Sequence, residues 1–171
     1  MTPPPLLWAV LGFVAASRIL EWLVTERNER ALRAAGAVAA PRDGLGAIAL
    51  VHASLFALAP LEWTFAPWPR MGPHTFVLLA AAVAAVALRY WAAFSLGVRY
   101  TKRVLRMPAA PLVVRGPYRF MRHPIYRAVW VEMVLWPLAF GLVATAAWLA
   151  LGNALALRHR IRIEERHLGL A

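Results

Sequence analysis

The chain of 171 residues contains no cysteine and few acidic side chains. The lack of cysteine excludes disulfides, thiolate nucleophiles and cysteine-ligated metals. There are 8 Asp and Glu residues against 19 Lys and Arg, which gives a net charge of +11. No GxGxxG fingerprint of a Rossmann nucleotide-binding domain is present. The chain also lacks a soluble basic domain and any recognised nucleic-acid motif, so we do not expect it to bind nucleic acid.

Two further patterns are missing. No HxxxH or HxxE pairing occurs within an apolar run, so we do not expect a metal site. The first apolar run is not preceded by a basic region and is not followed by an A-x-A cleavage site, as a secretory signal would be. That run is therefore expected to remain as a membrane span.

Hydrophobic residues, by contrast, make up 61% of the chain and include eight Trp. A soluble domain averages about 45–50% apolar residues, and a bilayer-spanning helix needs about 20 of them in a row. We predict an all-α, polytopic transmembrane bundle of about five spans, forming a single domain over residues 1–171. Three N-terminal spans are expected within 1–96, at Leu6–Val24, Gly44–Leu61 and His74–Leu96.

The apolar stretch Ala128–Leu157 is too long for one span and short for two. Pro137 and Gly141 divide it, which predicts a tight helical hairpin, the fourth and fifth spans, and leaves open whether its first arm crosses the bilayer fully. The charged tail that follows, Arg158–Ala171, is expected to be helical.

Basic residues are distributed unevenly. The segment Gly97–Arg127 holds eight of them and no acidic residue, and its Pro and Gly residues predict loops and short turns. The polar stretch Thr25–Asp43 is a plausible amphipathic surface helix that Gly36 and Pro41 would end. Because Lys and Arg accumulate on cytoplasmic loops, we expect the N-terminus outside and the C-terminus in the cytoplasm. The Ala- and Arg-rich composition suggests a bacterial inner membrane.

The run from Arg115 to Tyr126 is the densest polar motif. Gly116 can turn sharply and bring the backbone close to a ligand, and Pro124 disfavours a helical conformation at His123. Tyrosine rings in this run offer faces on which a sulfonium cation could rest. The alternative is a loop whose arginines only contact lipid phosphates.

Ionisable residues within apolar spans are a second group, because they are costly in lipid and often mark a site. Glu132 in the predicted fourth span is the leading candidate. Arg18 and Glu21 are three residues apart, and they can form an internal ion pair. His52 is more simply a satisfied core histidine.

Two polar groups follow toward the C-terminus. Asn153 can hydrogen-bond a ligand or a neighbouring helix. Arg160 and Glu164 are four apart and share a helix face, where they can form a surface ion pair. From these residues alone, the tail is best interpreted as a solvated helix.

The residues Gly116-Pro-Tyr-Arg, Arg122-His-Pro-Ile-Tyr126, Glu132, Pro137-Leu and Arg162-Ile-Glu-Glu165 resemble the isoprenylcysteine carboxyl methyltransferase family. Integral-membrane phospholipid methyltransferases share this C-terminal pattern. The N-terminal half is similar to a bacterial subgroup associated with methylating long-chain alkylpyrones. The resemblance covers roughly Leu88 to Leu168.

The resemblance implies that S-adenosylmethionine binds at the cytosolic end of the last helices, within the cofactor-binding catalytic region 97–171. It places Glu164 and Glu165 on polar groups of the cofactor, and Arg119, Arg122 or Arg162 at its carboxylate. An enol or phenol acceptor would need a base, either Glu132 or His123. The implied cofactor residues are Tyr118, Arg122, His123, Pro124, Tyr126, Asn153, Glu164 and Glu165, and the implied catalytic residues are Glu132, His123 and Arg162.

We therefore expect methyl transfer to an oxygen (carboxylate, enol or phenol) of a lipophilic small-molecule or isoprenoid acceptor drawn from the bilayer. A prenylated protein is a poor substrate candidate, given the bacterial composition. The alternatives are a phospholipid N-methyltransferase, an NADPH-dependent membrane reductase and a non-enzymatic protein that binds membrane lipids. A reductase would need more spans than 171 residues allow.

Overall fold

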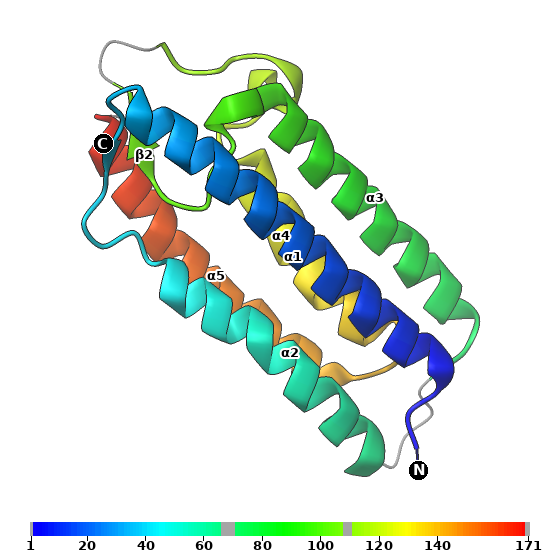
Figure 1. Cartoon of the computed structure of the whole chain (residues 1–171). Coiled ribbons are helices and arrows are strands. Elements are labelled where there is room, and N and C mark those ends of the chain that lie inside the picture. Colours follow the sequence, from blue (N-terminus) through cyan, green and yellow to red (C-terminus); the bar gives the residue numbers. More distant parts are fainter. Residues whose placement is uncertain (1, 66–70, 108–110, 170–171) are drawn as a thin grey trace.

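Five helices run roughly antiparallel and form one elongated bundle (Figure 1). The computed structural model describes residues 2–65, 71–107 and 111–169. The helices are α1 (Pro5–Ala34), α2 (Leu45–Phe65), α3 (Pro73–Leu96), α4 (Pro124–Leu138) and α5 (Val143–Leu168), with short 3₁₀ turns η1 (Gly97–Arg99) and η2 (Gly116–Arg119). Two-residue strands β1 (Val38–Ala39) and β2 (Leu105–Arg106) pair antiparallel, Val38 with Arg106 and Ala39 with Leu105.

Within the described residues, three helices, α1, α2 and α3, are long and apolar enough to cross a membrane. Large apolar side chains such as Trp8, Leu50 and Phe76 are exposed on them, as expected where lipid is the solvent. The predicted second and third spans agree with α2 and α3 to within a few residues. The chain is therefore an integral membrane protein.

The α4–α5 hairpin confirms the predicted division of the last apolar stretch. Helix α4 ends at Leu138, Gly141 adopts a positive φ of 67°, and α5 begins at Val143. With 15 residues, α4 is about 22 Å long, short of the roughly 30 Å hydrocarbon core. Helix α5 has 26 residues and includes the predicted charged tail up to Leu168; residues 170–171 lie outside the described part.

Helix α1 differs from the prediction. It runs without interruption from Pro5 to Ala34, so the stretch after Val24 continues the first helix and is not a separate surface helix. The ion pairs Arg30–Glu26 and Arg33–Glu29, at four-residue spacing, support its polar end. The helix stops just before Gly36, whose φ of 89° favours glycine.

Apolar side chains from all five helices form the core, including Leu11, Leu55, Val86, Met133 and Leu149. At the end where α2 meets the hairpin, Glu62 caps α5. Its two carboxylate oxygens accept from the backbone N–H groups of Ala144 (2.9 Å) and Thr145 (2.6 Å). A carboxylate here satisfies N–H groups that have no partner within the helix and complements the helix dipole.

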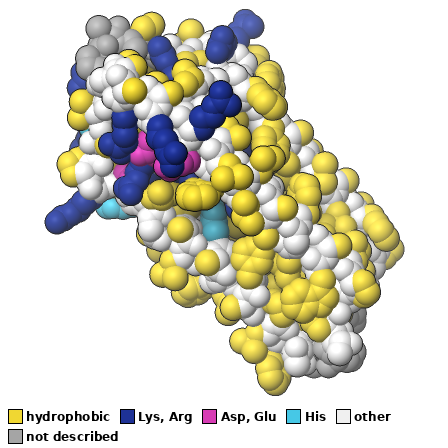
Figure 2. All heavy atoms as spheres, in the orientation of Figure 1, with side chains coloured by type: hydrophobic (Ala, Val, Ile, Leu, Met, Phe, Trp, Pro, Cys, Tyr) yellow, Lys and Arg dark blue, Asp and Glu magenta, His cyan; other side chains and the backbone are white. Residues whose placement is uncertain are grey.

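Basic residues gather at the opposite end. Figure 2 shows Lys and Arg concentrated near the C-terminus, while hydrophobic side chains cover most of the remaining visible face. The described parts of the connection between α3 and α4 are loops and short turns, as the Pro and Gly residues predicted, and the β1–β2 pair joins the segments that follow α1 and α3.

Candidate functional site

The first turn of α4 meets the last turns of α5 at the basic end. His123 Nε2 lies 3.1 Å from Glu165 Oε1, and the Tyr126 hydroxyl donates to Glu164 Oε2 at 2.5 Å. The hairpin thus brings together two segments that lie about 40 residues apart, the 115–126 run and the tail. We call His123, Tyr126, Glu164 and Glu165 the tail cluster.

Local sequence explains how α4 presents these groups. Pro124 is the first residue of α4, and His123 before it has a non-helical backbone (φ −127°, ψ 62°). The rings of His123 and Tyr126 stack with centroids 5.6 Å apart and planes 20° apart. Both side chains therefore leave the helix start in the same direction, toward α5.

Tyr118, on η2, belongs to the same end of the molecule. Burial, and then the negative charge of Glu164, raises the pKa of its phenol. Tyr118 therefore stays protonated at neutral pH and can donate a hydrogen bond.

The turn at Gly116 has a packing reason in the fold. Its φ is 59°, and a Cβ there would overlap the Ser95 hydroxyl and crowd the Trp91 ring nitrogen. Beside it, Arg115 Nε donates to the Ser95 carbonyl at 2.7 Å. The glycine is needed because η2 docks directly against the end of α3.

Arg160 joins the tail cluster to two other segments. Its Nε donates to the Tyr126 hydroxyl (3.2 Å), its Nη1 donates to the Asp43 carbonyl (2.6 Å), and its Nη2 donates to the Lys102 carbonyl. Its ion pair is with the Asp43 carboxylate at 3.5 Å. The four-residue spacing had suggested Glu164 as the partner, but Glu164 accepts from Tyr126 instead.

Other predicted site residues lie in different places. Arg122 and Arg162 are exposed at the basic end, near the tail cluster in sequence. Asn153 is fully buried and lies three turns before Glu164 on α5, with its Oδ1 3.3 Å from His52 Nε2. Asn153 is therefore grouped with His52 and not with the tail cluster.

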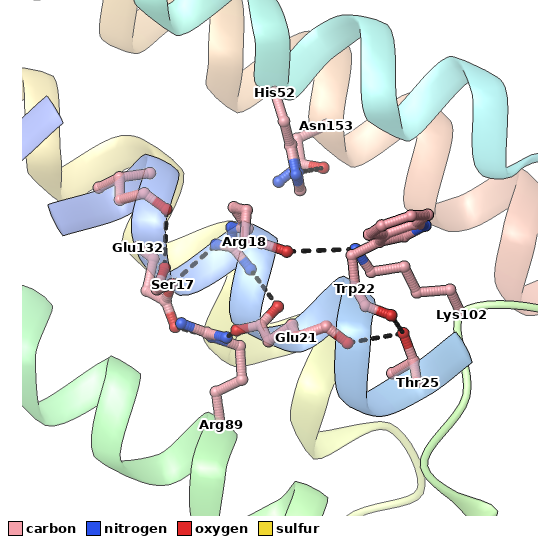
Figure 3. Close-up of polar contacts among 11 residues, drawn as sticks. Ser17, Arg18, Glu21, Trp22, Thr25, His52, Arg89, Lys102, Glu132 and Asn153 are labelled. Carbon is pink, nitrogen blue, oxygen red and sulfur yellow. Dashed lines mark hydrogen bonds and ion pairs between the residues drawn. The ribbon is translucent and has the colours of Figure 1, made fainter. Parts of the chain in front are cut away.

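Glu132 lies in a second polar group, buried among the helices (Figure 3). Its Oε1 accepts from Arg89 Nε at 2.6 Å, and its Oε2 accepts from Arg18 Nη2 at 2.9 Å. Arg18 also pairs with Glu21 at 3.2 Å, as its spacing predicted, and Arg89 pairs with Glu21 too. These four residues, the core ion cluster, carry two positive and two negative charges, which lowers the cost of their burial.

Sequence reasoning missed several of these partners. Neither Arg89 nor Lys102 was singled out as a candidate site residue from the sequence. Asp43 was assigned no role, although it is 4% exposed and binds Arg160. An arginine within an Ala- and Val-rich span was the available signal, because such a charge requires an internal partner.

Comparison with known proteins identifies the class. The signature of the isoprenylcysteine carboxyl methyltransferase (ICMT) family matches residues 77–169, more than half of the chain. The chain belongs to this family, whose members are membrane methyltransferases. The uncharacterized protein YpbQ of Bacillus subtilis (strain 168) is 29% identical over 161 residues, which cover 94% of this chain and 95% of the relative. No solved structure matches this chain significantly.

Family members use S-adenosylmethionine as the methyl donor, and the chemistry of the tail cluster fits that molecule. Two adjacent carboxylates can accept hydrogen bonds from an ammonium group and from ribose hydroxyls. Stacked aromatic rings offer faces that attract a sulfonium cation. Exposed arginines at the same end match a carboxylate.

Proposed function

We propose that this protein transfers a methyl group from S-adenosylmethionine to an oxygen of a lipophilic small-molecule acceptor that enters from the bilayer. The observation that carries the proposal is the tail cluster, in which α4 and α5 place two carboxylates beside a histidine and a tyrosine. The family membership of residues 77–169 supports the methyl-transfer chemistry. The basic end is proposed to face the cytoplasm of a bacterial cell, where the donor is made.

Each part of the tail cluster has a distinct task in this proposal. Glu164 and Glu165 bind the donor's amino group and ribose hydroxyls. The rings of His123 and Tyr126 lie against its sulfonium, and Arg122 or Arg162 pairs with its carboxylate. S-adenosylmethionine supplies an electrophilic methyl group when bound. The chain's contribution to rate is then mainly to hold the acceptor oxygen in line with that methyl group.

The base, where one is needed, is His123. An enol or phenol acceptor must lose a proton, whereas a carboxylate is already ionised. His123 is only partly buried, with 16% of its side chain exposed, and it lies within the tail cluster. Glu132 is a poor base because each of its carboxylate oxygens already accepts a hydrogen bond from an arginine. We assign Glu132 to positioning of the helices.

Ligand binding tests the proposal. The purified protein in phosphatidylcholine nanodiscs should be stabilised against heat by S-adenosylhomocysteine and not by NADPH. Glu165→Gln should lose this stabilisation, whereas Glu26→Gln, a matched change on the exposed end of α1, should retain it. Stabilisation by NADPH alone would favour a reductase, and stabilisation by neither ligand would refute the proposal.

The acceptor atom can be identified separately. Incubation with S-adenosylmethionine labelled in its methyl group and a bacterial lipid extract, followed by mass spectrometry, should yield a labelled O-methyl product. Label in a phospholipid headgroup amine would show N-methylation and overturn the proposed O-transfer.

A further inference from the structure

An open groove lies at the basic end of the molecule, between the segment that follows β1 and the last turns of α5. Its volume is about 580 Å³, which is within the range of small-ligand sites. The lining combines three apolar residues with two arginines and a histidine: Ala40, Pro41, Arg42, Ile163, Arg166 and His167. Such a mixture suits a ligand that is partly apolar and partly anionic.

The groove and the tail cluster use different faces of α5. Arg166 is two residues after Glu164, which places it about 160° around the helix, and Ile163 is displaced from Glu165 by the same angle. Both carboxylates contact the start of α4. The groove is therefore a separate site, and its arginines are not those assigned to the carboxylate of the methyl donor.

The two arginines of the groove lack a carboxylate partner. In the part of the chain that the structure describes, no ion pair includes Arg42 or Arg166, and Asp43 turns its carboxylate to Arg160 instead. His167 Nε2 lies 3.0 Å from a backbone carbonyl oxygen of β1, which holds its ring beside the groove. Two arginines without a counter-charge favour an anion, and the planar fork of a guanidinium group matches a phosphate.

The groove lies where the bundle leaves the hydrocarbon. Arg42 is three residues before α2, a candidate span that begins at Leu45. On α5, Leu155 is 70% exposed, and Arg166 is eleven residues later, about three turns further along the same face. Arg166 folds back toward the apolar part, because its Nε donates to the Arg162 carbonyl at 3.1 Å. A lipid whose acyl chain lies along Leu155 therefore has its headgroup at the groove.

We propose that the groove binds the phosphate of an anionic phospholipid. Arg42 and Arg166 pair with the phosphate, and the apolar lining residues contact the glycerol and the upper part of the acyl chains. Basic pockets between membrane helices bind anionic headgroups through such contacts. The bound lipid joins the segment before α2 to the last turns of α5. It is not the methyl acceptor, so this inference goes beyond the proposed function and does not depend on it.

Lipid binding by the full chain in a maltoside detergent tests this site. The probe is dioleoylphosphatidylglycerol, and the comparison ligand is dioleoylphosphatidylcholine, which has the same acyl chains but no net charge. Native mass spectrometry gives the Kd of each lipid. Phosphatidylglycerol should bind at least about tenfold more tightly, because two arginines act on its net negative charge. Arg42→Gln and Arg166→Gln should each remove most of that preference.

Arg158→Gln is the matched control. It removes an equal charge from an exposed position on the same helix, outside the groove lining, and it should leave the preference intact. All three residues are exposed, so we expect each variant to keep the thermal midpoint of the unsubstituted protein. Equal binding of the two lipids would overturn the proposal. An equal loss of preference in all three variants would show a general attraction of the basic end and would overturn it too.

Soluble anions distinguish a lipid from a free phosphate ester. Inorganic phosphate and glycerophosphate carry the same anionic group without acyl chains. At constant ionic strength, neither should displace bound phosphatidylglycerol at millimolar concentration. Displacement by either would assign the groove to a soluble phosphate compound and reject the lipid as its occupant.

Discussion

The core ion cluster and the tail cluster each contain two glutamates, yet the residues that pair with those glutamates differ. In the core ion cluster, Arg18 and Arg89 each form ion pairs with both Glu21 and Glu132. In the tail cluster, the partners of Glu164 and Glu165 are a phenol and a histidine. The first arrangement uses carboxylates to hold helices together, and in our proposal the second presents them to the methyl donor.

The largest expected effect comes from breaking the core ion cluster. Arg89→Met leaves two buried carboxylates with only Arg18, and removing one member of a buried pair typically costs about 3–5 kcal/mol. We expect a large fall in the thermal midpoint in detergent. Arg89→Met combined with Glu132→Leu should recover part of the loss, because it removes one charge of each sign. An unchanged midpoint in the single variant would show that this cluster does not hold the helices.

A change in the tail cluster should affect binding rather than stability. Glu165→Gln removes a partly exposed charge, so the thermal midpoint of the ligand-free protein should change little. The Kd for S-adenosylhomocysteine, measured by calorimetry, should rise at least about tenfold, which corresponds to about 1.4 kcal/mol. A much lower thermal midpoint with an unchanged Kd would show that the tail cluster stabilises the fold, as the core ion cluster does.

Tyr126→Phe should give a mixed and smaller effect. The hydroxyl joins Glu164 to Arg160, so its loss removes two hydrogen bonds at about 0.5–1.5 kcal/mol each. We expect a modest fall in thermal midpoint together with a Kd raised by several-fold. If only the midpoint moves, the hydroxyl serves packing and does not orient Glu164 for a ligand.

The smallest effect is expected at the far end of the bundle. Glu62→Gln weakens the cap on α5 and should lower stability by about 0.5–1 kcal/mol. Binding of S-adenosylhomocysteine should be unchanged, because the cap lies about 30 Å along α5 from Glu164. Thermal melts with and without ligand check both statements, and a change in affinity would show coupling along the helix.

Much of the fold could be predicted because it depends on local patterns. Hydrophobic runs located α2 and α3, and Pro137 with Gly141 located the hairpin turn. The hairpin in turn brings the tail to the start of α4. The continuous α1 was not predicted, because the change from apolar to charged residues at Val24 marks a change of environment and not a helix end.

Side-chain partners were harder to predict. Glu132 contacts Arg18 and Arg89, which are 114 and 43 residues away, and His52 contacts Asn153 at a separation of 101. Which residue an inward-facing polar group meets depends on how each helix is rotated about its axis. Composition and spacing do not specify that rotation, so the buried charges could be identified but not paired.

The contacts of Arg160 determine when, during synthesis of the protein, the site can assemble. It binds the segment after α1 through Asp43, the loop after α3 through Lys102, and the start of α4 through Tyr126. All three partners are synthesised before the arginine that joins them. When helices α1 to α4 have emerged from the ribosome but α5 has not, the chain therefore still lacks an assembled site. Competence to bind the donor should arise in a single late event, when the final helix takes its place.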